Sequence, residues 1–94
     1  MFEIQRHEDG RILLVGRFDA SQVEKAGAFL EGIEGPCTLD CSELEYISSA
    51  GLGVLLQALK QLTAADCSLR LIGLRENIRD IFRISGLDQI FNVE

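Results

Sequence analysis

The stretch CTLDCSELEYISSAGLGVLLQALKQL, residues 37–62, sets a strand pattern directly before a helix pattern. Apolar and polar residues alternate over 37–41, which is the period of a half-buried strand. Residues 43–47 are expected to form a short link to the pair Ser48-Ser49. Beyond that pair we predict an amphipathic helix whose first two turns are almost wholly buried. Its apolar stripe consists of Leu52, Leu55, Leu56, Leu59 and Leu62.

Upstream of this stretch the sequence predicts a hairpin of two strands. Residues 2–5 alternate apolar with polar, and Asp9-Gly10 is typical of a tight turn because glycine accepts a positive φ. The return strand, residues 11–17, contains a continuous apolar run, which is typical of a strand covered on both faces.

A first helix is predicted to follow this hairpin. Ser21 and Glu24 have the spacing of a capping box, so the helix should start at Ser21. Gly35-Pro36 should end it, because proline cannot continue a helix. Its buried stripe consists of Val23, Ala26, Leu30 and Ile33.

Downstream, residues 67–74 alternate again as a strand, and residues 75–85 are expected to form a third helix that Gly86 stops. A short last strand is predicted within 90–93. The order is therefore β-β-α-β-α-β-α-β, which predicts a single α/β domain over 1–94. Its mixed central sheet is opened by the N-terminal hairpin and carries three main helices on right-handed crossovers. The inner face of the third helix should consist of Ile78, Ile81, Phe82 and Ser85.

The composition suits one globular domain, with 94 residues of which 47% are hydrophobic and 26% charged. The formal net charge of −6 argues against direct nucleic-acid binding, which normally requires a basic surface. The charge is uneven, because residues 1–47 hold four basic and ten acidic side chains and residues 48–94 hold five of each. The acidic half of the chain is either a solvated face or a surface that attracts a partner through its charge.

The three cysteines indicate a reducing compartment. Cys37 and Cys41 on one strand would be about 13 Å apart, at about 3.3 Å per residue. A disulfide needs less than about 7 Å, so we expect no disulfide and no shared metal ion, only small buried thiols. The start of the chain lacks a basic segment followed by an apolar one, and the longest apolar run, residues 50–56, is too short for a membrane span. A cytoplasmic protein is expected.

The sequence offers no catalytic constellation. The single histidine, His7, lies beside the hairpin turn, and the pair Ser48-Ser49 lacks the Gly-x-Ser-x-Gly elbow of hydrolases. Residues 51–53, Gly-Leu-Gly, open a helix, but Leu56 stands where a dinucleotide fingerprint has its third glycine, and no Gly-Lys follows. We expect these glycines to let the helix start pack closely on a strand. The protein is therefore predicted to be non-enzymatic, with no cofactor and no metal.

The pair Ser48-Ser49 has two readings. A serine at a helix start commonly caps the helix by accepting from a free backbone N–H. The same place, beside the positive end of the helix dipole, also tolerates a phosphoryl group, which gains about 0.3–1 kcal/mol there. Added charge that leaves the fold intact is what a regulatory switch requires. The residues alone leave both roles open.

Residues 39–56, LDCSELEYISSAGLGVLL, resemble the signature of STAS domains, the family of anti-sigma factor antagonists. That signature is an apolar strand, then apolar-Asp-Ser-Ser-Gly-Leu-Gly, then an apolar helix. GRFDA, residues 16–20, resembles a second landmark of the family, Gly-x-apolar-Asp-Ala. Element order and length agree over essentially the whole chain. The chain departs from the motif at Ser48, where the family has Asp, and at Ala50, where it has a second Ser.

The resemblance implies a binding switch. In this family the unphosphorylated antagonist captures an anti-sigma factor, often itself a serine kinase, and frees a sigma factor. Phosphorylation of the first motif serine releases the partner, and a serine phosphatase resets the system. Aligned on Gly51, that serine is Ser49, with Ser48 as the alternative acceptor. Asp19 is expected either near Ser49 or as a helix cap. The resemblance makes the expected partner-binding residues Asp19, Ser48, Ser49, Ala50, Gly51 and Leu52.

A basic stripe lies on the predicted third helix, where Arg75, Arg79 and Arg83 recur every four residues. Glu76 and Asp80 can pair with the second and third arginines at three-residue spacing. The stripe is either a solvated, self-paired face or a contact surface for an acidic partner or anionic lipid. On the second reading Arg79 joins the partner-binding residues. An alternative function is also open, that of a STAS scaffolding subunit in a stress-signalling assembly or beside a membrane lipid transporter.

Overall fold

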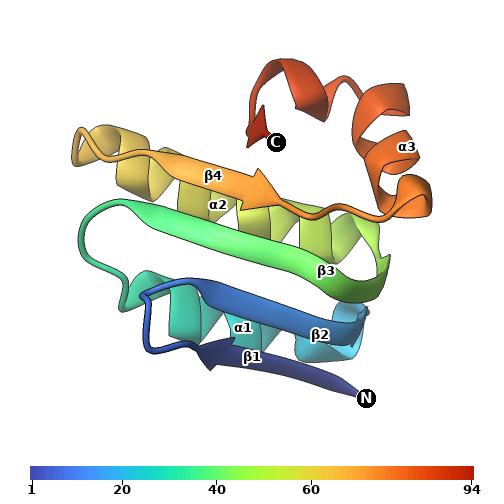
Figure 1. Ribbon diagram of the computed structural model, residues 1–94, viewed down its shortest axis with the longest axis horizontal. Helices are drawn as coiled ribbons and strands as arrows, with labels where there is room; N and C mark the ends of the chain where they lie inside the picture. The colour runs from blue at the N-terminus through green and yellow to red at the C-terminus, as the bar shows by residue number, and fades with distance from the viewer.

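The five strands of the computed structural model, which describes residues 1–94, form one mixed sheet in the order β1-β2-β3-β4-β5 (Figure 1). β1 (Phe2–Arg6) pairs antiparallel with β2 (Ile12–Phe18). β3 (Cys37–Ile47), β4 (Leu69–Ile72) and the short β5 (Asn92–Val93) follow in parallel. The predicted element order and the opening hairpin are confirmed. The turn is as expected, with Gly10 at φ +92°.

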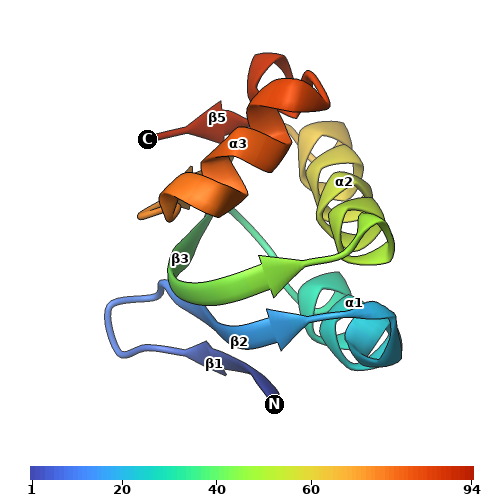
Figure 2. The ribbon, with the colours of Figure 1, turned by 90° about the vertical axis from the view of Figure 1, so that its right-hand side faces the viewer.

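Three helices connect the parallel strands. α1 (Val23–Glu31) and α2 (Ser49–Ala64) lie side by side against one face of the sheet, as the view in Figure 2 shows. α3 (Glu76–Ile84) packs beside the second half of β3, at the end of the sheet where β2 and β3 finish. The apolar run of β2 predicted a strand covered on both faces. Ile12, Leu13 and Leu14 are indeed all buried, although α1 and α2 cover only one face and Leu13 lies outside the main core cluster. None of the helices is long and apolar enough to cross a bilayer.

The prediction that residues 43–47 form a short link is wrong, because these residues are the second half of β3. It continues in parallel with β2 as far as the pair Phe18 and Ile47, with two register shifts on the way. Each shift moves the inward-facing positions, so that Leu44 and Ile47 follow Cys41 in the core at intervals of three instead of two. The period-2 pattern is therefore lost although the strand continues.

The starts of two helices also differ from the prediction. The chain passes through a 3-10 turn, Ala20–Gln22, before α1, and the side chain that caps this turn is Asp19, not Ser21. In α2 the first turns are not almost wholly buried, since Ala50 and Gly53 are exposed. The fully buried positions of α2 are Gly51, Leu55, Ala58 and Leu62.

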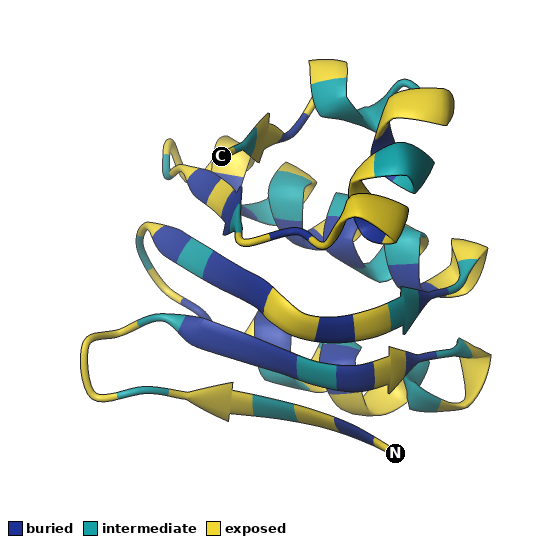
Figure 3. Cartoon of the chain, turned by 45° about the vertical axis from the view of Figure 1, so that its right-hand side comes forward, coloured by how far each residue is buried: buried dark blue, intermediate teal, exposed yellow.

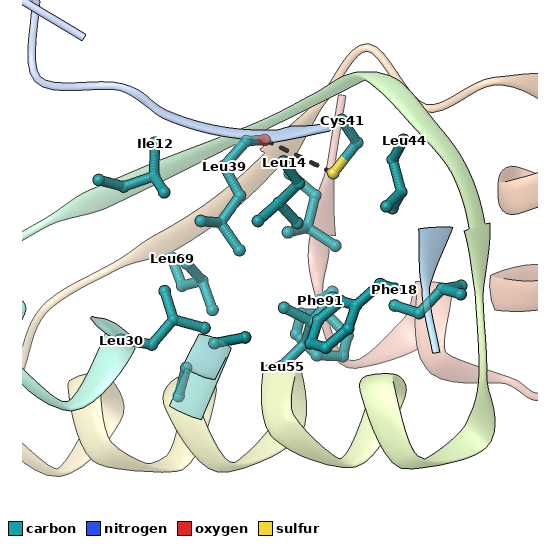
Figure 4. Packing of buried hydrophobic residues seen from close by; sticks show 14 of the residues in the cluster. Ile12, Leu14, Phe18, Leu30, Leu39, Cys41, Leu44, Leu55, Leu69 and Phe91 are labelled. Atoms are coloured by element: carbon teal, nitrogen blue, oxygen red, sulfur yellow. Dashed lines mark hydrogen bonds between the residues drawn. The ribbon is translucent and has the colours of Figure 1, made fainter. Parts of the chain in front are cut away.

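One apolar cluster lies between the sheet and the helices. Figure 4 shows labelled side chains from β2, β3, β4, α1 and α2, together with Phe91, meeting in it. The rings of Phe2 and Phe18 stack at a centroid separation of 4.6 Å, and Phe82 meets Phe91 edge-on at 5.5 Å. On α3 the predicted inner residues Ile78 and Phe82 are buried, whereas Ser85 is exposed. Burial is thus concentrated in β2, the first half of β3 and the inner faces of the helices (Figure 3).

The cysteines are free thiols in two environments. Cys37 and Cys41 are buried in β3, and burial raises the pKa of Cys41 to about 12 and also raises that of Cys37. Cys67, which precedes β4, is half-buried instead of fully buried. Since the thiolate is the reactive form, the two strand thiols should be inert while the protein is folded.

We expect one fast-reacting thiol in the native protein at pH 8, that of Cys67. Cys37 and Cys41 should react with a disulfide reagent such as DTNB only after denaturation, because their raised pKa keeps them protonated and the core excludes the reagent. Counting thiol equivalents released with and without guanidinium chloride tests this. Cys67→Ser should remove the fast phase. A native protein that releases three fast equivalents would contradict the burial of the two strand thiols.

Candidate functional site

The junction between β3 and α2 is built on the carbonyl of Phe18, the last residue of β2. Ser48 donates its backbone N–H to this carbonyl at 3.0 Å, which fixes the end of β3 against the end of β2. The hydroxyl of Ser48 accepts from the backbone N–H of Gly51 at 3.1 Å, and its carbonyl accepts from Leu52 at 2.9 Å. Ser48 is therefore the N-cap of α2, which is the first of the two roles that its sequence context allowed.

Gly51 lets the start of α2 press against the strand ends. A Cβ built there would lie 2.9 Å from Cγ1 of Ile47 and 3.1 Å from the carbonyl oxygen of Phe18. Gly53, by contrast, has open space around it. The expectation of close packing is confirmed for the first glycine and is wrong for the second.

Ser49 and Ala50 are the exposed residues of the first turn of α2. The hydroxyl of Ser49 makes no hydrogen bond with the rest of the chain, in contrast to that of Ser48, which is half-buried and engaged as the cap. Leu52 is half-buried and packs against the core cluster. The two serines, adjacent in sequence, thus have different surroundings: Ser48 belongs to the fold and Ser49 faces solvent.

Asp19 follows Phe18 directly and so lies beside this junction. Its carboxylate accepts from the backbone N–H of Ser21 at 3.0 Å and from the Ser21 hydroxyl. These hydrogen bonds, with a smaller contribution from the charge of Arg17, lower the pKa of Asp19. Asp19 is half-buried and makes no hydrogen bond to either motif serine. The expected capping role of Asp19 is confirmed, and the element it caps is the 3-10 turn before α1.

Arg17 and Tyr46 form the outer flank of the junction. The two residues are paired in the register of β2 and β3, and the guanidinium carbon of Arg17 lies 4.4 Å from the centroid of the Tyr46 ring. Each residue immediately precedes a core residue of the junction. This cation-π contact therefore links the ends of β2 and β3 outside the core.

α3 carries the basic stripe at the same end of the molecule (Figure 2). Arg79 is exposed and has no ion pair, whereas Arg83 pairs with Asp80 at 2.8 Å. The predicted pair of Glu76 with Arg79 does not form. Arg75 donates from Nε to the carbonyl of Ser42 at 3.1 Å.

Of the predicted site residues, the structure gathers Asp19 and Ser48 to Leu52 around Phe18 and places Arg79 apart, on α3. Sequence reasoning missed the role of Phe18, whose carbonyl joins the two strand ends. The signal that could have found it is its position just before Asp19 within GRFDA. His, Cys, Asp and Glu side chains do not gather into a group of three that could hold a metal.

Comparison with known proteins gives a consistent result. The family model described as the Mlab, STAS domain matches residues 2–93. The protein BtrV of Bordetella bronchiseptica, named as a candidate anti-sigma factor antagonist, is 40% identical over 81 residues, which cover 85% of this chain and 70% of that protein. The anti-sigma-B factor antagonist of Listeria monocytogenes is 31% identical over 87 residues, covering 88% of this chain and 76% of the relative.

Solved structures share the fold at lower sequence identity. An anti-sigma factor antagonist from Mycobacterium paratuberculosis superimposes with a TM-score of 0.76 at 18% identity, over 99% of this chain and 83% of the other. The Bacillus cell fate determinant SpoIIAA in its phosphorylated form gives a TM-score of 0.71 at 20% identity, over 100% and 91% of the two chains. With the family model matching almost the whole length, the chain belongs to the STAS domain family of anti-sigma factor antagonists.

Proposed function

We propose that this protein is a phosphorylation-controlled antagonist of an anti-sigma factor. In the unphosphorylated state, Asp19 and the first turn of α2 bind an anti-sigma factor of the serine-kinase type in the cytoplasm, and a sigma factor is released. A phosphate group on Ser49 breaks this contact, and a serine phosphatase later removes the phosphate. The observation that carries the proposal is the exposed Ser49 hydroxyl, free of hydrogen bonds, at the start of α2.

Ser49 is a better acceptor than Ser48 on structural grounds. A kinase must reach the hydroxyl and align it with a nucleotide phosphate, which an exposed side chain without partners allows. The Ser48 hydroxyl is half-buried and accepts the N–H of Gly51. Phosphorylating Ser48 would put a large dianionic group where the cap fits closely against the helix start. The proposed acceptor is therefore Ser49.

The fold should tolerate this phosphate, whereas the complex should not. The first amides of α2 have no carbonyl partners within the helix, and the helix dipole adds positive potential there. A phosphoserine, with about −1.5 to −2 charges, is thus accommodated in the free protein. In a complex the same group would be taken out of water or placed against the partner's charges, at a cost of several kcal/mol when it is unpaired. Release by charge requires no refolding.

The second candidate function is constitutive scaffolding, in a stress-signalling assembly or beside a membrane lipid transporter. It is favoured by the two departures from the family motif, Ser48 for Asp and Ala50 for Ser. Intact mass after incubation with ATP and native cell extract separates the two candidates. A gain of one phosphate that maps to the peptide containing Ser49 supports the switch, and an unmodified mass supports scaffolding.

Exchange of each serine for alanine should separate capping from phosphorylation. Ser48→Ala should lower the free energy of unfolding by about 1 kcal/mol, because the N–H of Gly51 loses its acceptor. Ser49→Ala should leave stability within about 0.5 kcal/mol of the wild type and abolish phosphate incorporation. Urea denaturation and mass spectrometry measure the two effects. Unchanged phosphorylation of Ser49→Ala would refute the assignment of the acceptor.

Variants of Asp19 test whether its charge contributes to anti-sigma factor binding in addition to capping the 3-10 turn. Asp19→Ala should weaken anti-sigma factor binding and slightly lower Tm. Asp19→Ser keeps a capping oxygen without the carboxylate, so it should restore Tm but not binding. If Asp19→Ser binds like the wild type, Asp19 is a cap only.

The capping contribution of Asp19 should depend on pH. Its pKa is lowered on folding, so the stabilisation is present above the unfolded pKa and is lost as the pH falls through the folded pKa. The Tm difference between Asp19→Ala and the wild type should therefore shrink in acid. Thermal melts from pH 7 down to pH 2 measure it. A difference that grows in acid would contradict this account.

Arg79→Glu should weaken the anti-sigma complex by roughly three- to tenfold at low salt, because an exposed cation facing an acidic partner is replaced by an anion. The loss should shrink as salt is added. Lys60→Glu makes the same change of charge on α2 and serves as the control, with a dissociation constant near that of the wild type. If both variants bind equally well, the basic stripe of α3 is a solvated face and does not contact the partner.

A further inference from the structure

The two helices that cover the sheet leave an apolar groove between them. Its volume is about 120 Å³, and its apolar lining consists of Val23 and Leu30 from α1 and Val54 and Ala58 from α2. An apolar cavity of about 150 Å³ is large enough to take up benzene, so this groove has room for one apolar side chain.

Gly27 keeps the groove open on the side of α1. It lies inside the helix without a positive φ, and a Cβ added there would meet nothing within 4 Å. Neither the backbone nor the packing requires glycine at this position. Glycine is nevertheless costly in a helix interior, so its presence in α1 is unexplained by the fold alone. It does leave space that any larger side chain would fill.

At its far end the groove is closed by hydrogen bonds between the two helices. Gln61 of α2 donates from Nε2 to the carbonyls of Leu30 at 3.5 Å and Glu31 at 3.2 Å, which ties α2 to the last turn of α1. Glu31 belongs to the lining at this end, is exposed and has no ion pair. The lining includes no cationic side chain. An apolar hollow with a carboxylate at one end is complementary to an apolar side chain followed by a basic one.

The groove begins one helical turn beyond the candidate site. Val54 lies one helical turn after Ala50, so the two residues share a face of α2, and Ala50 is the exposed neighbour of Ser49. A protein that covered Ser49 and Ala50 could therefore continue along this face of α2 to the groove.

We propose that the anti-sigma factor inserts one apolar side chain into the groove at Gly27 and pairs a lysine or arginine with Glu31. This inference rests on the proposed function and extends its interface from the first turn of α2 to the last turn of α1. It makes the groove a specificity element separate from the switch, because the space at Gly27 selects the partner whether or not Ser49 is modified.

Filling the groove tests the proposal. Gly27→Leu places a side chain in the hollow and replaces glycine with a better helix former, so Tm should be unchanged or higher. Ala28→Leu adds the same side chain to an exposed position of α1 outside the lining, and is the matched control. Each variant is titrated calorimetrically with each serine-kinase-type anti-sigma factor of the source organism, purified singly.

We expect the wild type and Ala28→Leu to bind equally and Gly27→Leu to bind roughly 10- to 100-fold more weakly. Glu31→Lys should also weaken binding, in a salt-dependent way. Equal binding by all four proteins would overturn the groove and leave the proposed function standing. Failure of the wild type to bind any of these factors would overturn the proposed function and this inference together.

Two controls separate loss of binding from misfolding. The Tm of Gly27→Leu shows whether this variant is folded. Gly27→Ala places a smaller side chain at the same position and should weaken binding correspondingly less.

Discussion

The hydrogen bond from the Ser48 amide to the Phe18 carbonyl joins two strand ends that lie side by side in the sheet. The turn that leads to α1 begins at the next residue after Phe18, and α2 begins at the next residue after Ser48. One backbone contact therefore sets the relative start of both helices. Gly51 makes the contact sterically feasible, because a side chain there would collide with the carbonyl that accepts the bond. The exposure of Ser49 and the spacing of the helices both follow from this arrangement.

The first turn of α2 has one side that is hydrogen-bonded into the fold and one side that is exposed. Ser48 and one carboxylate oxygen of Asp19 accept from local backbone amides, so these two side chains help to define the shape of the surface. Ser49 and Ala50 occupy the outside of the same turn. Modification of Ser49 thus changes the charge of the surface without removing any hydrogen bond that supports it. The residues that support this turn are therefore distinct from the residue that we propose as the phosphate acceptor.

Much of this arrangement could be predicted from local patterns. The helical stripe of α2, the capping role of Ser48 and the hairpin each follow from a few consecutive residues. The second half of β3 could not be recognised, because its register shifts against β2 break the alternation on which strand prediction depends. The capping-box spacing predicts a cap at Ser21 and not at Asp19, because it does not reveal that a 3-10 turn precedes the helix. The Phe18 contact and the groove at Gly27 join segments distant in sequence, and only packing reveals them.

The second half of β3 has a further consequence. β4 pairs with β3 only from Cys37 to Asp40, so beyond that point one side of β3 has no strand beside it. α3 fills this place, where Arg75 and Asn77 donate to the carbonyls of Ser42 and Glu45. Side-chain donors thus substitute for a missing strand and deny the position to a strand from another molecule. In this position α3 protects the protein against aggregation through this strand edge. Without α3, the second half of β3 would present an unpaired edge, at the end of the sheet where the protein is proposed to bind its partner.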